Sequence, residues 1–252
     1  MRHLFESWTE IAERLSGSRK IALFLDFDGT LAPIRPHPED VRLDPAARQT
    51  LATLARSPRF RVSVISGRKR SDVRARMRVP GIRYLGLHGW DNGTDTKLSA
   101  ESRAMLLCAK LRLRAQLLMA PGVWIEDKDE ILAVHFRNAG EDARQRASDA
   151  VHAAAESYSK HLRLAPGREV WEIIPRELED KGAAVRRELA ALCCDATPIY
   201  AGDDLGDEPA FAALRQGITI YVGRARRTEA RFHLADSHEV HSFLNRLRSV
   251  FA

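Results

Sequence analysis

Acidic residues directly follow two apolar segments of this chain, residues 21–27 and 198–201. They are Asp26 and Asp28 at the end of the first segment, and Asp203, Asp204 and Asp207 after the second. Carboxylates at the end of a buried strand are costly unless a cation or substrate compensates their charge. Carboxylate oxygens are ligands that a hard cation such as Mg²⁺ prefers. We therefore expect all five residues to contribute to a Mg²⁺ site where the two segments end.

Two further positions carry groups suited to binding an anion. Ser66-Gly67-Arg68 follows the apolar segment 61–65 and is expected to open a helix, and Lys181 begins a segment with helical spacing. A hydroxyl and backbone N–H groups at the start of a helix can hold a phosphate oxygen. A lysine at a helix N-terminus is unfavourable for the helix dipole, which favours a functional Lys181. The structural alternatives are an N-cap for Ser66 and a surface lysine at 181.

The apolar segments alternate with helical patterns along most of the chain. Short continuous apolar runs are typical of parallel strands that are buried on both faces. We expect strands at 21–27, 61–65, 83–87, 198–201 and 218–222, and helices at 5–16, 45–56, 181–192 and 208–214. This alternation predicts an α/β fold with a doubly wound, Rossmann-like parallel sheet. Ligands of such folds bind beyond the carboxyl ends of the strands, where the candidate residues lie.

The middle of the chain has a different order. Helical patterns at 101–119 and 141–161 each precede two strand patterns, at 122–126, 131–136, 162–165 and 169–173. We expect turns at Lys128-Asp129 and Pro166-Gly167. The α-β-β-α-β-β order predicts an α+β module with an antiparallel sheet. We therefore expect a catalytic core formed by residues 1–94 and 174–252 and an inserted cap, residues 95–173, that acts as a lid.

Composition restricts the class of protein. The 252 residues include 40 Lys and Arg against 34 Asp and Glu, a net charge of +6 that suits an anionic substrate or a nucleic acid. The densest basic stretch, residues 56–83, also has the spacing of a solvated helix face. The chain holds no apolar run of the roughly 18 residues that a membrane span needs. Three cysteines (Cys108, Cys193 and Cys194), of which two are adjacent, favour the reducing cytoplasm over a disulfide-bonded location.

Taken together, the motifs carry a resemblance. Asp26-Phe27-Asp28-Gly29-Thr30, Ser66, Lys181 and Gly202-Asp203-Asp204 with Asp207 resemble the four ordered motifs of the haloacid dehalogenase superfamily. Segments in both core and insert more narrowly resemble the trehalose-6-phosphate phosphatase family. They are LFLDFDGTLAPI, VISGR, GLHG, IEDK, AVHFR, EVWEI, DKG and GDDLGDEPAF. One departure is Gly206, where that family usually has Thr.

The resemblance implies a phosphoryl-transfer mechanism. Asp26 is expected to be the nucleophile that forms an aspartyl-phosphate, and Asp28 the general acid and base. Mg²⁺ would be held by Asp26, the main-chain oxygen of Asp28 and Asp203, with Asp204 and Asp207 binding it directly or through water. Ser66 and Lys181 complete the expected catalytic set by holding the phosphate oxygens.

The expected substrate is trehalose 6-phosphate, hydrolysed to trehalose and phosphate. Substrate-binding candidates are Ser66, Arg68, His88, Glu126, Lys128, His135, Arg137 and Glu172. Trp124 and Trp171 are expected in the core of the cap. A related glycosyl or pseudosugar phosphate, of the glucosylglycerol or sucrose type, is the alternative substrate. An alternative outside the enzymes is a basic nucleic-acid-binding protein. The sequence lacks a basic motif interleaved with aromatic residues, which argues against this alternative. A monomer is the working expectation, with the oligomeric state left open.

Overall fold

The computed structural model describes residues 1–35, 37–94, 97–167, 169–192, 195–224 and 226–252. Cys193 and Cys194 lie outside the described residues. The chain folds into two compact units, which we call the core unit (Met1–Gly93 with Asp180–Ala252) and the cap unit (Thr94–Glu179). Residues 174–179 group with the cap unit, whereas the sequence pattern placed the return to the core at residue 174. No helix of the described residues is long and apolar enough to cross a membrane.

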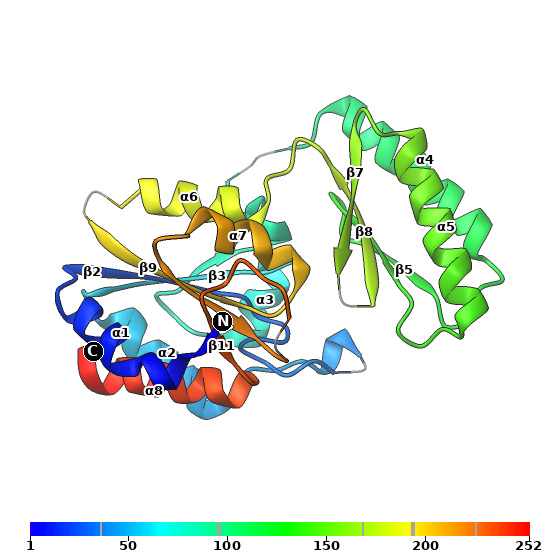
Figure 1. Ribbon diagram of the computed structural model, residues 1–252. Coiled ribbons are helices and arrows are strands. Elements are labelled where there is room, and N and C mark those ends of the chain that lie inside the picture. The colour runs from blue at the N-terminus through cyan, green and yellow to red at the C-terminus, as the bar shows by residue number, and fades with distance from the viewer. Residues whose placement is uncertain (36, 95–96, 168, 193–194, 225) are drawn as a thin grey trace. The chain divides into compact units, whose positions relative to one another are not determined.

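The core unit contains a seven-stranded sheet in the order β1-β11-β10-β9-β2-β3-β4, in which every neighbouring pair is parallel (Figure 1). Its strands are β1 (Arg2–His3), β2 (Lys20–Leu25), β3 (Phe60–Ile65), β4 (Arg83–Leu85), β9 (Ala196–Gly202), β10 (Ile218–Val222) and β11 (Phe232–Leu234). The chain winds from β2 towards β3 and β4 on one side, and from β9 towards β10 and β11 on the other. The topological switch point, where ligands of such sheets bind, therefore lies at β2 and its neighbour β9.

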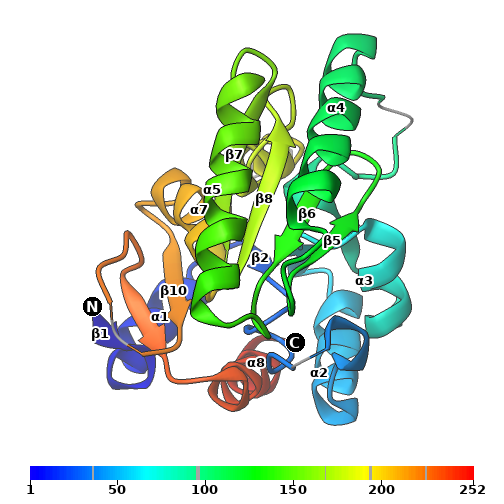
Figure 2. The same ribbon diagram turned by 90° about the vertical axis from the view of Figure 1, so that its right-hand side faces the viewer.

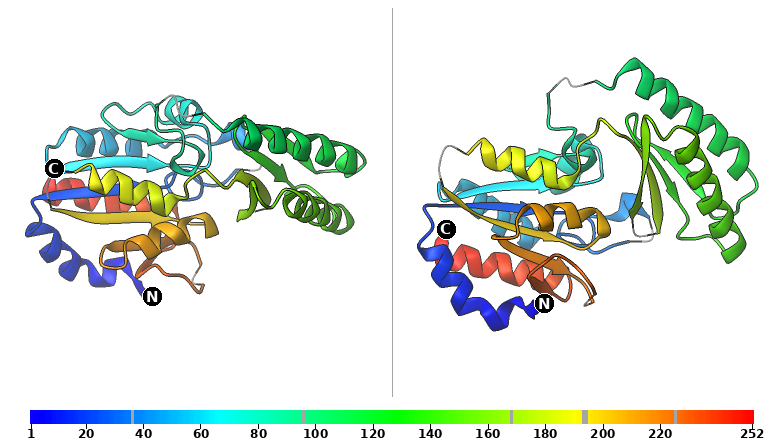
Figure 3. Two further views of the ribbon diagram at one scale, coloured as in Figure 1. Left: turned by 90° about the horizontal axis from the view of Figure 1, so that it is seen from above. Right: turned by 45° about the horizontal axis from the view of Figure 1, so that its top comes forward.

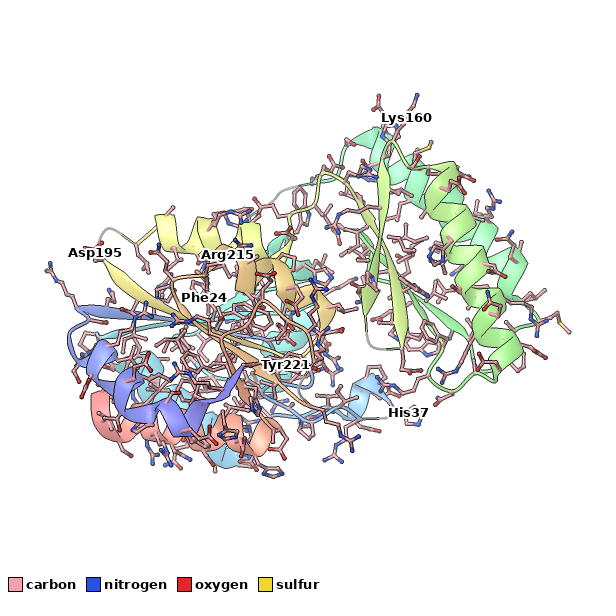
Figure 4. All side chains as sticks on the ribbon, viewed as in Figure 1. Phe24, His37, Lys160, Asp195, Arg215 and Tyr221 are labelled. Carbon is pink, nitrogen blue, oxygen red and sulfur yellow. The ribbon has the colours of Figure 1, made fainter. Side chains whose placement is uncertain are left out.

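Two layers of helices cover this sheet (Figure 3). The helices of the core unit are α1 (Trp8–Ser16), α2 (Pro45–Arg56), α3 (Arg70–Met77), α6 (Lys181–Ala190), α7 (Glu208–Ala213) and α8 (Ser237–Phe251). One buried apolar cluster joins α1, α2, α3 and α8 to one face of the sheet. A second cluster, which includes Phe24 and Tyr221, packs α6 and α7 on the opposite face (Figure 4). Burial on both faces explains why the strands are continuous apolar runs.

The cap unit contains a four-stranded antiparallel sheet in the order β5-β6-β8-β7. Its elements are α4 (Ala100–Leu117), β5 (Trp124–Asp127), β6 (Leu132–His135), α5 (Glu141–Ser157), β7 (Leu162–Gly167) and β8 (Val170–Pro175). Both helices lie on one face of this sheet (Figure 2). The predicted fold class, a parallel α/β core with an inserted α-β-β-α-β-β module, is confirmed.

Side-chain caps explain why several helices begin where they do. The Asp44 carboxylate accepts the backbone N–H groups of residues 46 and 47, and Pro45 occupies the first helical position of α2. The Asp180 carboxylate accepts from the N–H of Ala183 at a distance of 2.8 Å and so fixes the start of α6 at Lys181. The cap at Asp180 therefore places Lys181 at the beginning of its helix, as its position in the sequence predicted.

Some local predictions were wrong. Ser66-Gly67-Arg68 does not open a helix, because α3 begins at Arg70 after the extended residue Lys69. Pro166 and Gly167 are not a turn but the end of β7, where they pair with residues 171 and 170 of β8. Since β7 is an edge strand, it tolerates a proline, which has no N–H to donate to a ladder.

The two tryptophans of the cap also differ from each other. The prediction that Trp124 belongs to the cap core was wrong, since 43% of this residue is exposed. Its ring stacks on His135 with the centroids 3.9 Å apart. Trp171 lies on the opposite face of the sheet, where its ring contacts His152 of α5. The alternation of side chains along β5 and β8 places the two rings on different faces of the cap sheet.

Candidate active site

A buried ammonium group joins the ends of two adjacent strands. Lys181 Nζ donates to Asp26 Oδ1 at 2.8 Å and to Asp207 Oδ1 at 2.7 Å. Asp26 follows β2, and Asp207 ends the short 3₁₀ helix η4 (Leu205–Asp207) after β9. The exposed fractions of the three residues are 5% or less. The structure thus brings together three side chains that the sequence singled out, at the carboxyl edge of the parallel sheet.

Two glycines allow the acidic side chains to approach this closely. Gly29 has φ +81°, and a Cβ atom at this position would overlap the carboxylate of Asp203. A Cβ atom at Gly202 would likewise overlap the carboxylate of Asp207. Thr30 Oγ1 donates to Asp203 Oδ1 at 3.4 Å. The turn after Asp28 and the last residue of β9 therefore need glycine to make room for the two carboxylates.

Burial and mutual repulsion disfavour the ionised forms of the acids in this cluster. Burial raises the pKa of Asp26, Lys181 opposes the shift, and Asp207 and Asp28 add to it, so that the pKa reaches about 7. Burial and the neighbouring carboxylates of Asp26 and Asp207 also raise the pKa of Asp203 well above its ordinary value. Burial favours a neutral amine, but the charges of Asp207 and Asp26 outweigh it and raise the pKa of Lys181. The carboxylates therefore have more negative charge than Lys181 alone compensates.

The cluster fits a divalent cation. Asp26, Asp203 and Asp207 each offer a carboxylate oxygen, and these oxygens all lie within 4.8 Å of one another. A hard oxygen donor set of this kind suits Mg²⁺, and a cation would stabilise the ionised forms of the buried acids. The structure therefore supports a metal-binding aspartate cluster at the place where the sequence predicted one. The side chains of Asp28 and Asp204 have other partners.

Asp204 and Asp207 form a capping box around η4. Asp204 Oδ1 accepts the N–H of Leu205 at 2.7 Å, while Asp207 Oδ2 accepts the N–H of Asp204 at 2.9 Å. Asp207 also directly precedes α7, but its side chain makes no capping hydrogen bond to that helix. Its carboxylate closes the capping box of η4 and contacts Lys181 instead. Metal binding by Asp204 stays a prediction.

Sequence reasoning missed Tyr200 as a component of the site. This tyrosine of β9 is fully buried, and its Oη donates to Asp207 Oδ1 at 2.7 Å. Burial and the charge of Asp207 raise the pKa of Tyr200 well above its ordinary value, so the hydroxyl stays a donor. A polar residue within an otherwise apolar buried strand was the available signal. Tyr200 holds the acceptor that Lys181 also uses.

Ser66 lies at the end of β3, the other neighbour of β2 in the sheet. The residue is buried, its N–H donates to Leu85 O at 3.0 Å, and its carbonyl accepts from the N–H of His88 at 2.9 Å. Leu87 and His88 have positive φ angles, 47° and 61°. Such strained backbone persists where surrounding contacts over-determine it and is typical of functional sites. The strained turn after β4 therefore supports Ser66 at the edge of the sheet that carries Asp26.

Asp28 contacts an arginine from the same loop as Ser66. Arg68 Nε donates to Asp28 Oδ2 and Arg68 Nη2 to Asp28 Oδ1, each at 2.7 Å. Arg68 Nη1 donates to Asp72 Oδ2 at 2.9 Å. The charges and hydrogen bonds of Asp28 and Asp72 outweigh the effect of burial and raise the pKa of Arg68. This loop therefore places Arg68 against two carboxylates of the core unit itself.

The candidate sugar-binding residues of the cap gather on the face of its sheet that the helices leave uncovered. Lys128 Nζ donates to Glu172 Oε1 at 2.7 Å, and His135 Nε2 lies 2.9 Å from Glu126 Oε2. Pairing in register aligns Glu126 with Ala133 and Glu172 across three neighbouring strands. Arg137 follows β6, and its carbonyl accepts from Arg144 Nη2 at 2.9 Å. The cap sheet thus presents paired acids and bases on one surface.

Known proteins have sequences similar to this chain. Residues 24–238 match the family described as Trehalose-phosphatase. A trehalose-phosphate phosphatase of Mycobacterium tuberculosis is 38% identical over 245 residues, which cover 91% of this chain and 62% of that protein. A probable trehalose-phosphate phosphatase 4 of Oryza sativa subsp. japonica is 35% identical over 254 residues, covering 94% of this chain and 68% of that protein. The chain thus spans about 62% of the length of its mycobacterial relatives.

Solved structures show the same fold. The C-terminal domain of a C. albicans trehalose-6-phosphate phosphatase superposes with a TM-score of 0.85 at 20% identity and covers 96% of both chains. A trehalose-6-phosphate phosphatase related protein has a TM-score of 0.75 at 26% identity, covering 91% of this chain and 97% of that one. A haloacid dehalogenase-like hydrolase from Bacteroides thetaiotaomicron has a TM-score of 0.65 at 12% identity, covering 90% of this chain and 99% of that one. This chain belongs to the trehalose-phosphatase family, as the segments of its core and insert predicted.

Proposed function

We propose that this chain is a Mg²⁺-dependent phosphatase that hydrolyses trehalose 6-phosphate to trehalose and phosphate. The observation that carries the proposal is the buried Asp26–Lys181–Asp207 cluster with Asp203 at the switch point of a trehalose-phosphatase fold. A phosphate monoester needs a nucleophile, charge stabilisation and a proton donor for the leaving oxygen. The cluster and the adjoining Asp28 supply groups for each of these needs.

Asp26 acts as the nucleophile in this proposal. Its carboxylate attacks phosphorus, and the bond between phosphorus and the sugar oxygen breaks as that oxygen takes a proton from Asp28. Water then attacks the aspartyl-phosphate, gives its proton to Asp28 and releases phosphate, and the Asp26 carboxylate is regenerated. Lys181 orients Asp26 through the 2.8 Å contact. Ser66 and Lys181 are proposed to hold the phosphate oxygens.

Asp26, the main-chain oxygen of Asp28 and Asp203 are the proposed Mg²⁺ ligands, with Asp204 and Asp207 in contact directly or through water. When bound, Mg²⁺ neutralises charge so that an anionic carboxylate and an anionic phosphate can approach each other. Asp26 must be ionised to act as a nucleophile, whereas burial raises its pKa to about 7. A cation at the cluster supports the ionised form, which is a physical reason for the metal requirement.

The core and cap units are proposed to divide the work, with chemistry in the core unit and sugar recognition on the cap. Glu126, Lys128, His135 and Glu172 lie on the uncovered face of the cap sheet, and Arg137 and His88 are further candidates. Paired carboxylates and cations suit the hydroxyl groups of a disaccharide, since they offer both acceptors and donors. Gly206 stands where the family usually has Thr. Because of this difference, a related glycosyl phosphate is the second candidate substrate.

The basic stretch does not favour the nucleic-acid alternative. Arg68 and Arg76 both pair with Asp72, and Arg83 pairs with Glu188 of α6. Since these arginines form ion pairs with acids of the core unit, their positive charge is partly neutralised within the protein. A reducing location such as the cytoplasm is proposed from the cysteine pattern, and the described Cys108 is a free thiol.

The test is a panel of phosphorylated sugars incubated with purified protein. Phosphate release is measured from trehalose 6-phosphate, sucrose phosphate, glucosylglycerol phosphate and glucose 6-phosphate, with Mg²⁺ or with EDTA. We expect Mg²⁺-dependent release with the highest kcat/KM for trehalose 6-phosphate. The Asp26→Asn variant, nearly isosteric but far less nucleophilic, is the matched inactive control. Preference for another sugar would favour the second candidate, and no release from any sugar would reject the phosphatase proposal.

A further inference from the structure

Arg68 holds Asp28 with a forked contact. Nε and Nη2 of the guanidinium donate to the two different oxygens of the carboxylate, each at 2.7 Å. A planar guanidinium that binds both oxygens of a carboxylate fixes the plane of that carboxylate as well as its position. The side chain of Asp28 is 36% exposed and is followed by Gly29 with φ +81°. The carboxylate is therefore partly open to solvent, and the fork fixes its orientation.

The rest of the guanidinium is bound to other groups of the core unit. Nη1 donates to Asp72 Oδ2 at 2.9 Å, and Nη2 also donates to the carbonyl oxygen of Pro38 at 2.9 Å. The guanidinium carbon lies 5.8 Å from the centre of the Phe27 ring. The Arg68 side chain is only 13% exposed. All three guanidinium nitrogens thus donate to acceptors of the protein itself. This arrangement suits a side chain that holds Asp28 in place.

Arg68 is itself fixed at both ends. Its backbone N–H donates to Ser66 Oγ at 3.1 Å, and its carbonyl accepts from the N–H of Leu87 at 2.8 Å. At the other end, Asp72 is held by Arg76, whose Nε donates to Asp72 Oδ1 at 2.8 Å. A side chain that is supported in this way can hold a catalytic group within a narrow range of orientations.

We infer that Arg68 is a positioning residue for Asp28, in place of the substrate-binding role expected from the sequence. The inference rests on the proposed function, in which Asp28 accepts a proton from the attacking water. In that step a water oxygen bonds to phosphorus, and the bond from phosphorus to Asp26 breaks with its electron pair returning to the carboxylate. The water proton passes to Asp28. Because Arg68 is a donor only, it occupies one side of each Asp28 oxygen and leaves the outward lone pairs for the water.

The experiment compares three variants with trehalose 6-phosphate as substrate. Arg68→Met removes the fork, Arg68→Lys keeps the charge without the fork, and Arg83→Met is the matched control. Arg83, at the start of β4, also binds a carboxylate of the core unit, Glu188 Oε2 at 2.6 Å, and belongs to neither the fork nor its support. For each protein kcat, KM and the inhibition constant of inorganic phosphate are measured, together with thermal unfolding.

We expect Arg68→Met to lower kcat by about 10-fold to 100-fold, since misplacing a catalytic group by about 1 Å has effects of this size. KM and the inhibition constant of phosphate stay within about threefold of wild type, because Arg68 does not hold the phosphate group. Arg68→Lys stays well below wild type, because an ammonium is a point charge that cannot bind both oxygens in one plane. Arg83→Met keeps kcat within about threefold of wild type, because its pair with Glu188 contacts neither Arg68 nor Asp28.

Three results would overturn the inference. A rise in KM and in the inhibition constant of phosphate that matches the loss of kcat would make Arg68 a phosphate ligand. Full activity of Arg68→Lys would show that only the positive charge at this position matters. Full activity of Arg68→Met would show that Arg68 has no role in positioning Asp28. If Arg68→Met does not fold, the same criteria apply to Arg68→Lys. Absence of phosphate release by the wild-type protein would instead reject the proposed function, so the two failures are distinguishable.

Discussion

Lys181 Nζ lies 2.8 Å from Asp26 Oδ1, although 155 positions separate the two residues in the sequence. The ammonium comes from the first residue of α6, and the carboxylate follows β2 directly. A lysine at a helix N-terminus opposes the helix dipole, and its burial adds a desolvation cost. Contacts with Asp26 and Asp207 offset both effects. The stability of the core unit and the chemistry proposed for it therefore both depend on this cluster.

Replacing Lys181 should destabilise the fold strongly. The variant Lys181→Met leaves buried carboxylates without their ammonium partner, and breaking a buried pair in this way costs about 3–5 kcal/mol. Urea unfolding at neutral pH in EDTA measures the loss. Arg2→Met is the control, because Arg2 and Glu10 form an exposed pair on the same unit, for which a loss of about 0–1 kcal/mol is expected. Equal losses in the two variants would contradict the role given to Lys181.

The stability of the metal-free protein should fall as the pH rises from the ordinary Asp26 pKa of 3.8 to about 7. In this window folded Asp26 holds its proton while the unfolded carboxyl has lost it, so the folded state binds more protons and loses stability with rising pH. Above about pH 7 Asp26 contributes no further change. Asp203, whose pKa is also raised, acts in the same direction.

The measurement is the difference in unfolding free energy between wild type and Asp26→Asn at several pH values in EDTA. We expect the wild-type protein to lose stability relative to the variant as the pH rises through this window. Mg²⁺ should stabilise the wild type more at about pH 8 than at about pH 5, because metal ligands must be deprotonated. A difference that does not change with pH would show that the pKa of Asp26 is not raised.

Tyr200→Phe should impair the site while leaving the fold intact. The change removes a donor to Asp207 Oδ1, and losing a hydrogen bond to a charged group costs about 1.5–3 kcal/mol. We expect a clear fall in kcat, because Asp207 then constrains Lys181 less. Tyr84→Phe is the matched control, since Tyr84 is also buried and its Oη donates to Val79 O at 2.8 Å, away from the cluster. Unchanged kcat in Tyr200→Phe would show that Lys181 and the N–H of Asp204 hold Asp207 without the tyrosine.

Gly29→Ala should weaken metal binding. The new Cβ atom would overlap the carboxylate of Asp203, and φ +81° is strained for alanine. Displacing the proposed ligand Asp203 should raise the dissociation constant of Mg²⁺ by about tenfold or more. Loss of a residue that merely orients a metal ligand already weakens metal binding by about this factor. Isothermal titration calorimetry measures it. Gly206→Ala is the control, because a Cβ atom there has no heavy atom within 4 Å among the described residues. Equal Mg²⁺ affinity in both variants would place the metal away from Asp203.

Lys128→Met should affect recognition of the sugar and not the chemistry. Lys128 and Glu172 form a nearly buried pair on the uncovered face of the cap sheet. We expect KM for trehalose 6-phosphate to rise by about tenfold, a loss typical of one charge-assisted contact. Hydrolysis of p-nitrophenyl phosphate, which has no sugar, should stay unchanged. Lys110→Met, which removes a pair with Asp127 on the helix side of the cap, should leave both substrates unaffected. Parallel losses for both substrates would reject a role in sugar recognition.

Elements with local signals were predicted closely. The Asp44 cap and Pro45 set the start of α2, which spans Pro45–Arg56 as the sequence pattern indicated. The strands that end in motif residues were found because burial on both faces leaves a continuous apolar run. The edge strand β1 and its neighbour β11 were missed, since two- and three-residue strands depend on partners distant in sequence. Helix α8 was also overlooked, although Asp236 and the apolar spacing of Val240, Phe243 and Leu247 carry a signal.

The sequence by itself determined the residue types at the strand ends, their order along the chain and hence the family, because each motif is a local run of residues. It also indicated that the acids after β2 and β9 would converge, because parallel strands end at one edge of a sheet. Only the tertiary structure decided which groups touch. The packing of the strand ends and loops brings the Tyr200 hydroxyl into hydrogen-bond contact with Asp207. It likewise brings the Arg68 guanidinium into contact with Asp28. Such contacts depend on side-chain directions and on space left by Gly29 and Gly202, which no local pattern encodes.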